Sequence, residues 1–170
     1  MKIDMCKAYD RVNWNFLKVV MLAMNFSNTW VNWIMECVTT VKYTLLINGI
    51  PTQTIHPTRG NKQGDPISPY LFLLWANILS IALSQVENIR LIKGISIGRQ
   101  GVSFTHLFFF NADDSLFFFQ KDKSSLTSLW KIILWYCSIS GQCIINFNKS
   151  NLYCSPNIPQ NEQENIASPL

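Results

Sequence analysis

Apolar residues recur every three or four positions in two early segments, which predicts two amphipathic helices. The first is predicted to follow a capping residue at Asp10 or Asn13, because both side chains accept hydrogen bonds from a first helical turn. The second is predicted to start near Thr29. Their expected inward faces are Trp14, Leu17, Met21 and Met24 in the first helix, and Trp30, Ile34, Cys37, Val38 and Val41 in the second.

Two later segments carry the same periodicity and a start signal. Ser68 followed by Pro69 predicts a third helix, with the serine as cap and the proline in the first turn, running to about Gln85. Ser124 is predicted to cap a fourth helix. The side chains expected to face inward from this fourth helix are Leu126, Leu129, Trp130, Ile133 and Cys137.

Short apolar runs bounded by turn residues predict strands. Asn48-Gly49 between two such runs is a strong hairpin signal. A second hairpin is expected where two runs of phenylalanine flank residues 111–115. The predicted strands are residues 2–5, 43–47, 51–55, 94–98, 104–110, 116–119 and 144–153. Because helices and strands mix without a repeated strand–helix–strand unit, we predict an α+β fold.

Length and composition predict how the chain is divided into domains. The chain has 170 residues and is 48% hydrophobic, which suits one domain with a real core. We predict a folded domain over residues 1–154 and a disordered tail over 155–170, which is rich in proline, asparagine and glutamine. The apolar stretch 70–83 is interrupted by polar residues, and we interpret it as too short to span a bilayer, so no membrane partner is expected.

Charge and cysteine usage narrow the function classes. The formal charge is +4, and residues 1–154 carry 14 basic against 8 acidic side chains. This modest basic excess favours a polyanionic partner. The five cysteines include no CxxC pair, which argues against a zinc site and a secreted disulfide scaffold, so we expect reduced, mostly packed thiols inside the cell. His56 and His106 have no ligand spacing and receive no predicted chemistry.

Adjacent aspartates at Asp113 and Asp114 stand between the two phenylalanine runs. Carboxylates beside apolar residues need a cation or hydrogen bonds, and a rigid acid pair suits a hard divalent cation. Asp4 ends another predicted strand. If that strand lies beside the hairpin, three carboxylates can hold two Mg²⁺ ions about 4 Å apart, as phosphoryl-transfer sites do. Sequence spacing does not establish this convergence.

Four ordered motifs supply a family resemblance. Residues 4–10 read DMCKAYD and resemble the D-x-x-x-A-[FY]-D motif of reverse transcriptases. Residues 59–69 read RGNKQGDPISP and resemble R-G-x-x-Q-G-D-P-x-S-P. Residues 112–114 read ADD, similar to the core [FY]-x-D-D. Residues 140–150 read SGQCIINFNKS, similar to S-G-Q-x-I-N-x-x-K-S.

The wording and order of these motifs resemble LINE-type, non-LTR retrotransposon enzymes. The resemblance implies a polymerase palm, an antiparallel sheet with helices on one face, present as a partial copy without fingers and thumb. It implies RNA-directed DNA polymerase activity with two Mg²⁺ ions, or Mn²⁺, on an RNA template, a DNA primer and deoxynucleoside triphosphates. A nuclear location is expected because such elements insert DNA there. Intron-encoded and telomerase-like enzymes fit the second and fourth motifs less well.

The resemblance also assigns roles to individual residues. Asp4 and Asp113 would be the main metal ligands, with Asp114 as a nearby acid. Nucleotide contacts would come from Tyr9 under the sugar, Gln63 and Gly64 against the nucleotide, Arg59 at phosphate, and Lys149 at the leaving pyrophosphate. Without the motifs, Tyr9 also fits a core tyrosine and Lys149 a solvated lysine.

Two departures from the family pattern bear on activity. Two extra residues, Phe110 and Asn111, lengthen the strand before Asp113, and one extra isoleucine, Ile144 or Ile145, enters the fourth motif. An insertion in a strand shifts or bulges the residues that follow. We therefore expect this copy to be weak or inactive. The alternatives are a non-catalytic retroelement remnant and a nucleic-acid-binding module.

Overall fold

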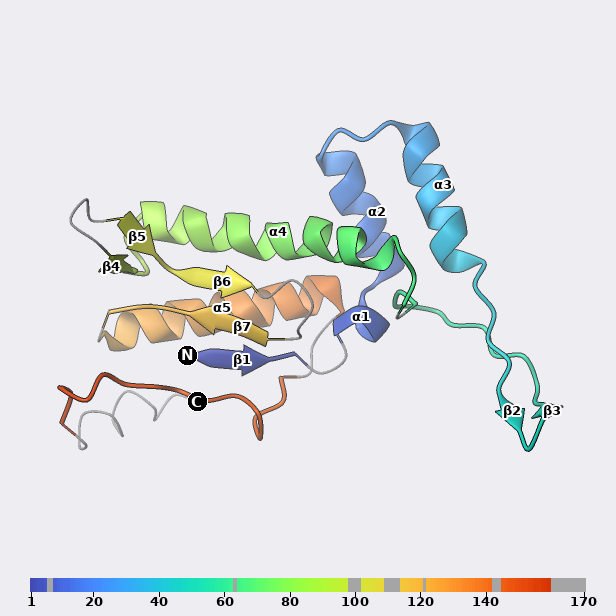
Figure 1. The fold of residues 1–170 in the computed structure, drawn as a ribbon. Helices are drawn as coiled ribbons and strands as arrows, with labels where there is room; N and C mark the ends of the chain where they lie inside the picture. The colour runs from blue at the N-terminus through green and yellow to red at the C-terminus, as the bar shows by residue number, and fades with distance from the viewer. Residues whose placement is uncertain are drawn as a thin grey trace.

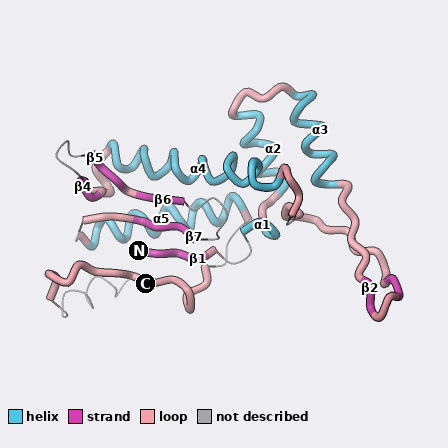
Figure 2. The backbone as a smooth tube through the Cα atoms, in the orientation of Figure 1, coloured by secondary structure: helices cyan, strands magenta, loops and turns pink. Residues whose placement is uncertain are grey.

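The structure is a computed structural model of the chain, and it describes residues 1–5, 8–62, 64–97, 102–108, 114–120, 122–141 and 145–159. Its helices and small antiparallel sheets confirm the predicted α+β class (Figure 1). The backbone trace in Figure 2 shows the layout: strands and long helices form one body, and a two-stranded arm projects from it.

A three-stranded sheet lies at the centre, with strand order β1-β7-β6 and antiparallel pairing throughout. The three strands are β1 (Lys2–Asp4), β7 (Asp114–Phe117) and β6 (His106–Phe108). The first residues of the chain therefore pair with a strand from its second half, which lies beside them in Figure 1.

The free edge of β1 is covered by the segment 145–151. Isolated bridges join Lys2 to Asn151 and Met5 to Ile145. The continuous strand predicted over 144–153 does not form, because the Asn146 carbonyl accepts the backbone N–H groups of Lys149 and Ser150 and curls the chain into a turn. Residue 144 lies outside the described residues.

Two long helices pack on one face of this sheet. They are α4 (Ser68–Asn88) and α5 (Lys123–Ser140). One apolar cluster joins Ile3 and Phe117 from the strands to Trp75 of α4 and Ile133 of α5. The Tyr136 hydroxyl of α5 donates to the Trp75 carbonyl of α4 at 3.2 Å, and burial raises the pKa of that hydroxyl.

Helix α4 extends beyond its predicted end at Gln85. With 21 residues it is long and apolar enough, by length and composition, to cross a membrane, so the prediction that this segment is too short was wrong. The interrupting polar residues do not stop the helix, since helical periodicity places them away from the buried stripe. That stripe includes Leu71, Trp75, Leu79 and Leu83, each at most 1% exposed, and it packs into the core cluster.

Of the three helix N-caps predicted from the sequence, one forms as predicted. Asn13 caps α2 (Trp14–Ala23), as predicted, by accepting from the backbone N–H groups of Asn15 and Phe16. Ser68 is not a cap: it is the first helical residue, and its hydroxyl donates to the Lys62 carbonyl at 2.8 Å. Ser124 is not a cap either, because the charged carboxylate of Asp122 accepts the Ser124 N–H and begins α5 two residues earlier.

The remaining elements surround this body. α1 (Ala8–Arg11) follows β1, and α3 (Asn28–Thr39) packs on α2. The predicted Asn48-Gly49 hairpin forms, with β2 (Leu46–Ile47) and β3 (Ile50–Pro51) projecting as an exposed arm (Figure 1). Cys37 is exposed rather than inward, because Val31, Ile34 and Val38 define the buried face of α3.

The single strand predicted over 104–110 is instead divided at Thr105. β4 (Ile95–Ile97) pairs with β5 (Val102–Phe104), and β6 starts only at His106. The break is held by side chains: the Thr105 hydroxyl donates to the Glu87 carboxylate at 3.1 Å and lies 2.9 Å from His106 Nδ1. His106 Nε2 lies 2.7 Å from the Ser80 hydroxyl on α4.

Burial favours the neutral imidazole at His106. The single Thr105 hydroxyl proton goes to Glu87, so Nδ1–H donates to Thr105; in the neutral ring Nε2 then accepts from Ser80. Burial lowers the pKa of His106 from 6.5, and the nearby Glu87 carboxylate partly opposes this shift.

We expect the neutral His106 to make stability depend on pH. The unfolded chain binds the proton more readily, so the free energy of unfolding should fall as pH drops from 6.5 through the lower pKa of the folded state. Urea midpoints measured from about pH 5 to about pH 7.5 should show this slope in the native chain and less of it in His106→Gln. The exposed His56 provides the control: His56→Gln should keep the native slope. Equal slopes in all three chains would contradict the assignment.

Candidate active site

Asp4 and Asp114 are backbone register partners in the antiparallel strands β1 and β7. In this register Lys2 pairs with Leu116, Ile3 with Ser115, and Asp4 with Asp114. Both aspartates therefore lie at the same end of the sheet, and Asp4 is half-buried beside the buried Ile3. Asp113 lies outside the described residues. The structure thus brings together the first motif and the hairpin that carries the third.

The fourth motif holds the backbone of Asp4 from its other side. The Asp4 N–H donates to the Ser150 hydroxyl at 3.1 Å, and the Asn146 N–H donates to the Asp4 carbonyl at 3.0 Å. The Ser150 hydroxyl in turn donates to the Asn146 carbonyl at 2.8 Å. Lys149 is exposed on the same turn. Asp4 is therefore fixed between two segments that are distant in sequence.

Tyr9 packs into the core next to this strand end. Its ring stacks on Phe72 with centroids 5.2 Å apart and meets the edge of Trp75 at 6.4 Å. The ring is half-buried, so both sequence interpretations, a core tyrosine and a ring beside a bound sugar, are compatible with its position. Its backbone carbonyl accepts the Asn61 N–H at 2.7 Å, which ties the second motif to the first.

The second motif docks closely on α1 and α2 through Gly60. The Gly60 N–H donates to the Val12 carbonyl at 2.9 Å, and the Trp14 indole N–H donates to the Gly60 carbonyl at 2.8 Å. A Cβ at Gly60 would overlap the Asp10 carbonyl. A Cβ at Gly64, by contrast, would meet nothing within 4 Å. The predicted contact of Gly64 with the nucleotide stays a prediction, and Gln63 lies outside the described residues.

Asn61 is a residue that sequence reasoning missed. It is only 5% exposed, and neither its amide oxygen nor its amide nitrogen has a hydrogen-bond partner. Buried amides are nearly always paired, so this one is available to a group that approaches the loop. The sequence offers no signal for it, because asparagine in a glycine-rich loop is ordinary.

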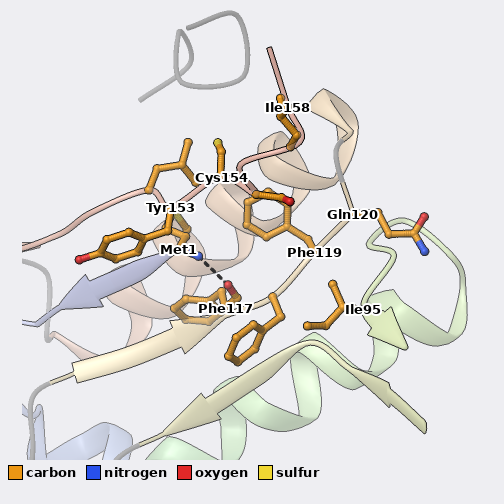
Figure 3. A pocket seen from close by; sticks show the side chains of 11 residues that line it. Met1, Ile95, Phe117, Phe119, Gln120, Tyr153, Cys154 and Ile158 are labelled. Atoms are coloured by element: carbon orange, nitrogen blue, oxygen red, sulfur yellow. Dashed lines mark hydrogen bonds between the residues drawn. The ribbon is translucent and has the colours of Figure 1, made fainter. Parts of the chain in front are cut away.

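A large hollow lies at the opposite end of β1. It has a volume of about 370 Å³ and is lined by Met1, by side chains of the β7 end such as Phe117 and Phe119, and by Tyr153 and Cys154 (Figure 3). The Met1 amino group donates to the Phe117 carbonyl at 2.7 Å, and burial lowers the pKa of this group. Because Met1 and Asp4 are at opposite ends of one strand, this apolar hollow is separate from the aspartates.

The sequence as a whole decides the family. Residues 1–166 match the reverse transcriptase (RNA-dependent DNA polymerase) family. The chain belongs to the reverse transcriptase family. It is also 31% identical over 114 residues to an uncharacterised mitochondrial protein of Arabidopsis thaliana, an alignment that covers 67% of this chain and 90% of that protein. The family match passes the predicted domain end at residue 154, and residues 160–170 lie outside the described ones, so that boundary stays a prediction.

Membership gives the general chemistry of the site. Reverse transcriptases act on a nucleic acid template with nucleotide substrates and generally use divalent metal ions. Among the side chains that the structure describes, no group of three histidine, cysteine, aspartate or glutamate residues is placed to hold a metal. Asp4, the acid of the first motif, has Asp114 as its strand partner.

Proposed function

We propose that this chain carries the nucleotidyl-transfer centre of an RNA-directed DNA polymerase of the LINE type, built on a polymerase palm. The observation that carries the proposal is the register of β1 and β7, which sets Asp4 directly opposite Asp114. Residues directly opposite each other in antiparallel strands have Cβ atoms roughly 5 Å apart. We further propose that the enzyme works in the nucleus, where such elements insert DNA.

Electrostatics supports a cation at this position. Like charges directly opposite each other destabilise a strand pair, so two carboxylates at one sheet end are unfavourable unless a cation lies between them. Asp113 adds a third carboxylate next to this pair in the sequence. An all-oxygen donor set of this kind suits Mg²⁺ or Mn²⁺ and does not suit softer metals that prefer thiolate.

We assign Asp4 and Asp113 as the main ligands of two metal ions, with Asp114 as a supporting acid. Bound Mg²⁺ would lower the pKa of the primer 3′-hydroxyl and neutralise the charge that develops on the leaving pyrophosphate. The hydrogen bonds from Asn146 and to Ser150 hold the Asp4 backbone in place for this task. Precise placement matters because metal sites tolerate only small errors in ligand position.

The incoming deoxynucleotide is proposed to lie against Tyr9, Gln63 and Gly64. The Tyr9 ring is braced by Phe72 and Trp75, so it cannot move aside for a 2′-hydroxyl, which would favour deoxyribonucleotides. Lys149, exposed on the turn that holds Asp4, is proposed to supply a proton to pyrophosphate. The RNA template and the DNA primer are the remaining partners.

A second candidate is a remnant that binds nucleic acid without catalysis. The observation that favours it is the insertion of Phe110 and Asn111 before Asp113. Two added residues lengthen an extended strand by roughly 6–7 Å or force a bulge, which would move Asp113 relative to Asp4.

Primer extension separates the two candidates. We expect the chain, given an RNA template, a DNA primer and deoxynucleoside triphosphates, to add nucleotides slowly with Mg²⁺ or Mn²⁺ and not with a chelator. Deleting Phe110 and Asn111 should raise the rate. If neither chain extends the primer with either metal while both still bind the template–primer duplex, the remnant is the correct assignment.

A further inference from the structure

A polar groove lies where α1 meets α2, and its lining includes neither Asp4, Asp114 nor Tyr9. Its volume is about 300 Å³. Two arginines, Arg11 and Arg59, line it together with Trp14, short polar side chains and one glycine. These other lining residues include Asn13, Asn15, Thr58 and Gly141.

Two of the four motif segments, together with the residues that directly follow the first motif, build this groove. The second motif supplies Arg59, and the fourth supplies Gly141. Arg11, just after the first motif, and residues 13–15 at the start of α2 complete the lining. Backbone contacts lock them together: the Asn13 N–H donates to the Ser140 carbonyl at 2.9 Å, and the docked Gly60 follows Arg59 directly. The groove is therefore a preformed feature of the fold.

The charge of the groove is positive. The described residues that line it include neither aspartate nor glutamate. The Nε atom of Arg11 is buried and has no hydrogen-bond partner. A partly buried cation without a carboxylate partner carries an unrecovered desolvation cost, which an anionic ligand would offset.

We propose that this groove binds a phosphate group. Arginine presents a planar fork of donors that matches phosphate oxygens, and two arginines can hold one phosphate from two sides. The amides of Asn13 and Asn15 and the Thr58 hydroxyl add short neutral hydrogen-bonding groups at its rim. Sequence reasoning predicted a phosphate contact for Arg59, and the structure adds Arg11 as a second lining arginine.

The phosphate can come from a polynucleotide backbone or from a nucleoside triphosphate. This part of the inference rests on the proposed polymerase function, whereas the groove itself does not. A position at the junction of α1, α2 and the second motif lets the groove hold a strand outside the metal site. A phosphodiester contact of this kind would position the template without reading its sequence.

Binding measured without catalysis tests the proposal. Fluorescence anisotropy with a labelled single-stranded RNA should show affinity loss of roughly tenfold in Arg11→Gln/Arg59→Gln, with the slope of log affinity against log salt smaller by about 1–2. The charge-matched control, Lys93→Gln/Lys131→Gln, removes two exposed lysines that do not line the groove and should bind like the native chain. The single variant Arg59→Gln is the second test in case the double variant folds poorly. Arg59 is exposed, and this variant should show part of the affinity loss.

Competition identifies the source of the phosphate. Loss of RNA binding with unchanged deoxynucleoside triphosphate binding assigns the groove to the backbone, and the reverse pattern assigns it to the triphosphate. The Nε–H resonances of Arg11 and Arg59, followed by NMR during titration with inorganic phosphate, should shift in the native chain. Unchanged RNA and triphosphate affinity in the arginine variants, or no measurable binding by the native chain, overturns the proposal. If the native chain does not extend a primer but still binds RNA or triphosphate through the two arginines, the proposed metal site is wrong and the phosphate groove stands.

Discussion

Replacing Asp4 with asparagine is expected to abolish metal-dependent primer extension and to stabilise the metal-free protein slightly. The first effect follows because a metal ligand contributes several kcal/mol of charge stabilisation, which corresponds to a rate loss of about a thousandfold or more. The second follows because the neutral amide would no longer repel the aspartate opposite, a gain of up to about 1 kcal/mol. The decisive geometry is the pairing of Asp4 with Asp114.

Extension rates and thermal melts with and without Mg²⁺ measure both effects. The native chain should melt at a higher temperature when Mg²⁺ is added, and Asp4→Asn should lose that increase. Glu36→Gln, at an exposed carboxylate on α3, is the control and should retain it. If Asp4→Asn lowers the metal-free melting temperature and leaves the response to Mg²⁺ intact, Asp4 has only a structural role.

Gly60→Ala is expected to destabilise the protein by about 2–5 kcal/mol, because it adds a steric overlap to an unfavourable backbone conformation. Gly60 has φ of 83°, and a Cβ there would collide with the Asp10 carbonyl. Relief of the overlap would pull the second motif away from α1 and break the bonds from Gly60 to Val12 and from Trp14 to Gly60. Urea unfolding measures the loss directly.

Gly64 provides a matched control for this substitution. It has the same φ of 83°, but a Cβ there would meet nothing within 4 Å. Gly64→Ala should therefore cost about 1 kcal/mol, the strain of the left-handed conformation alone. The difference between the two variants measures the docking of the second motif on the first. Equal losses would show that Gly60 is not in close contact with Asp10.

Local sequence signals predicted most helices and one hairpin correctly. Asn13 capped its helix, Asn48-Gly49 formed its turn, and the inward face of α5 included Leu126, Leu129 and Ile133 as the spacing indicated. These features depend on residues a few positions apart, so a short window of sequence contains their causes. Where two polar residues competed for one role, the window was insufficient: Asp122 displaced Ser124 as a cap.

The candidate site illustrates the opposite case. The motifs named Asp4, Tyr9 and Arg59 as functional residues, and the family match covers all three. The neighbours of these residues were not predictable from the sequence, because they come together only after the chain folds back on itself. Asp4 pairs with Asp114 in the strand register, Tyr9 stacks on Phe72, and Arg59 lines a groove with Arg11. The orphaned amide of Asn61 belongs to the same class of feature.

The sequence by itself determined the fold class, the family and the identity of the acids, since each rests on residue type and order along the chain. Only the tertiary structure decided which acids are partners in the strand register and which glycine the second motif needs to pack on α1. It also decided that Arg59 and Arg11 line one groove. The physical reason is that strand register and loop docking depend on contacts between residues far apart in sequence. Such contacts leave no periodic pattern in the segments that make them.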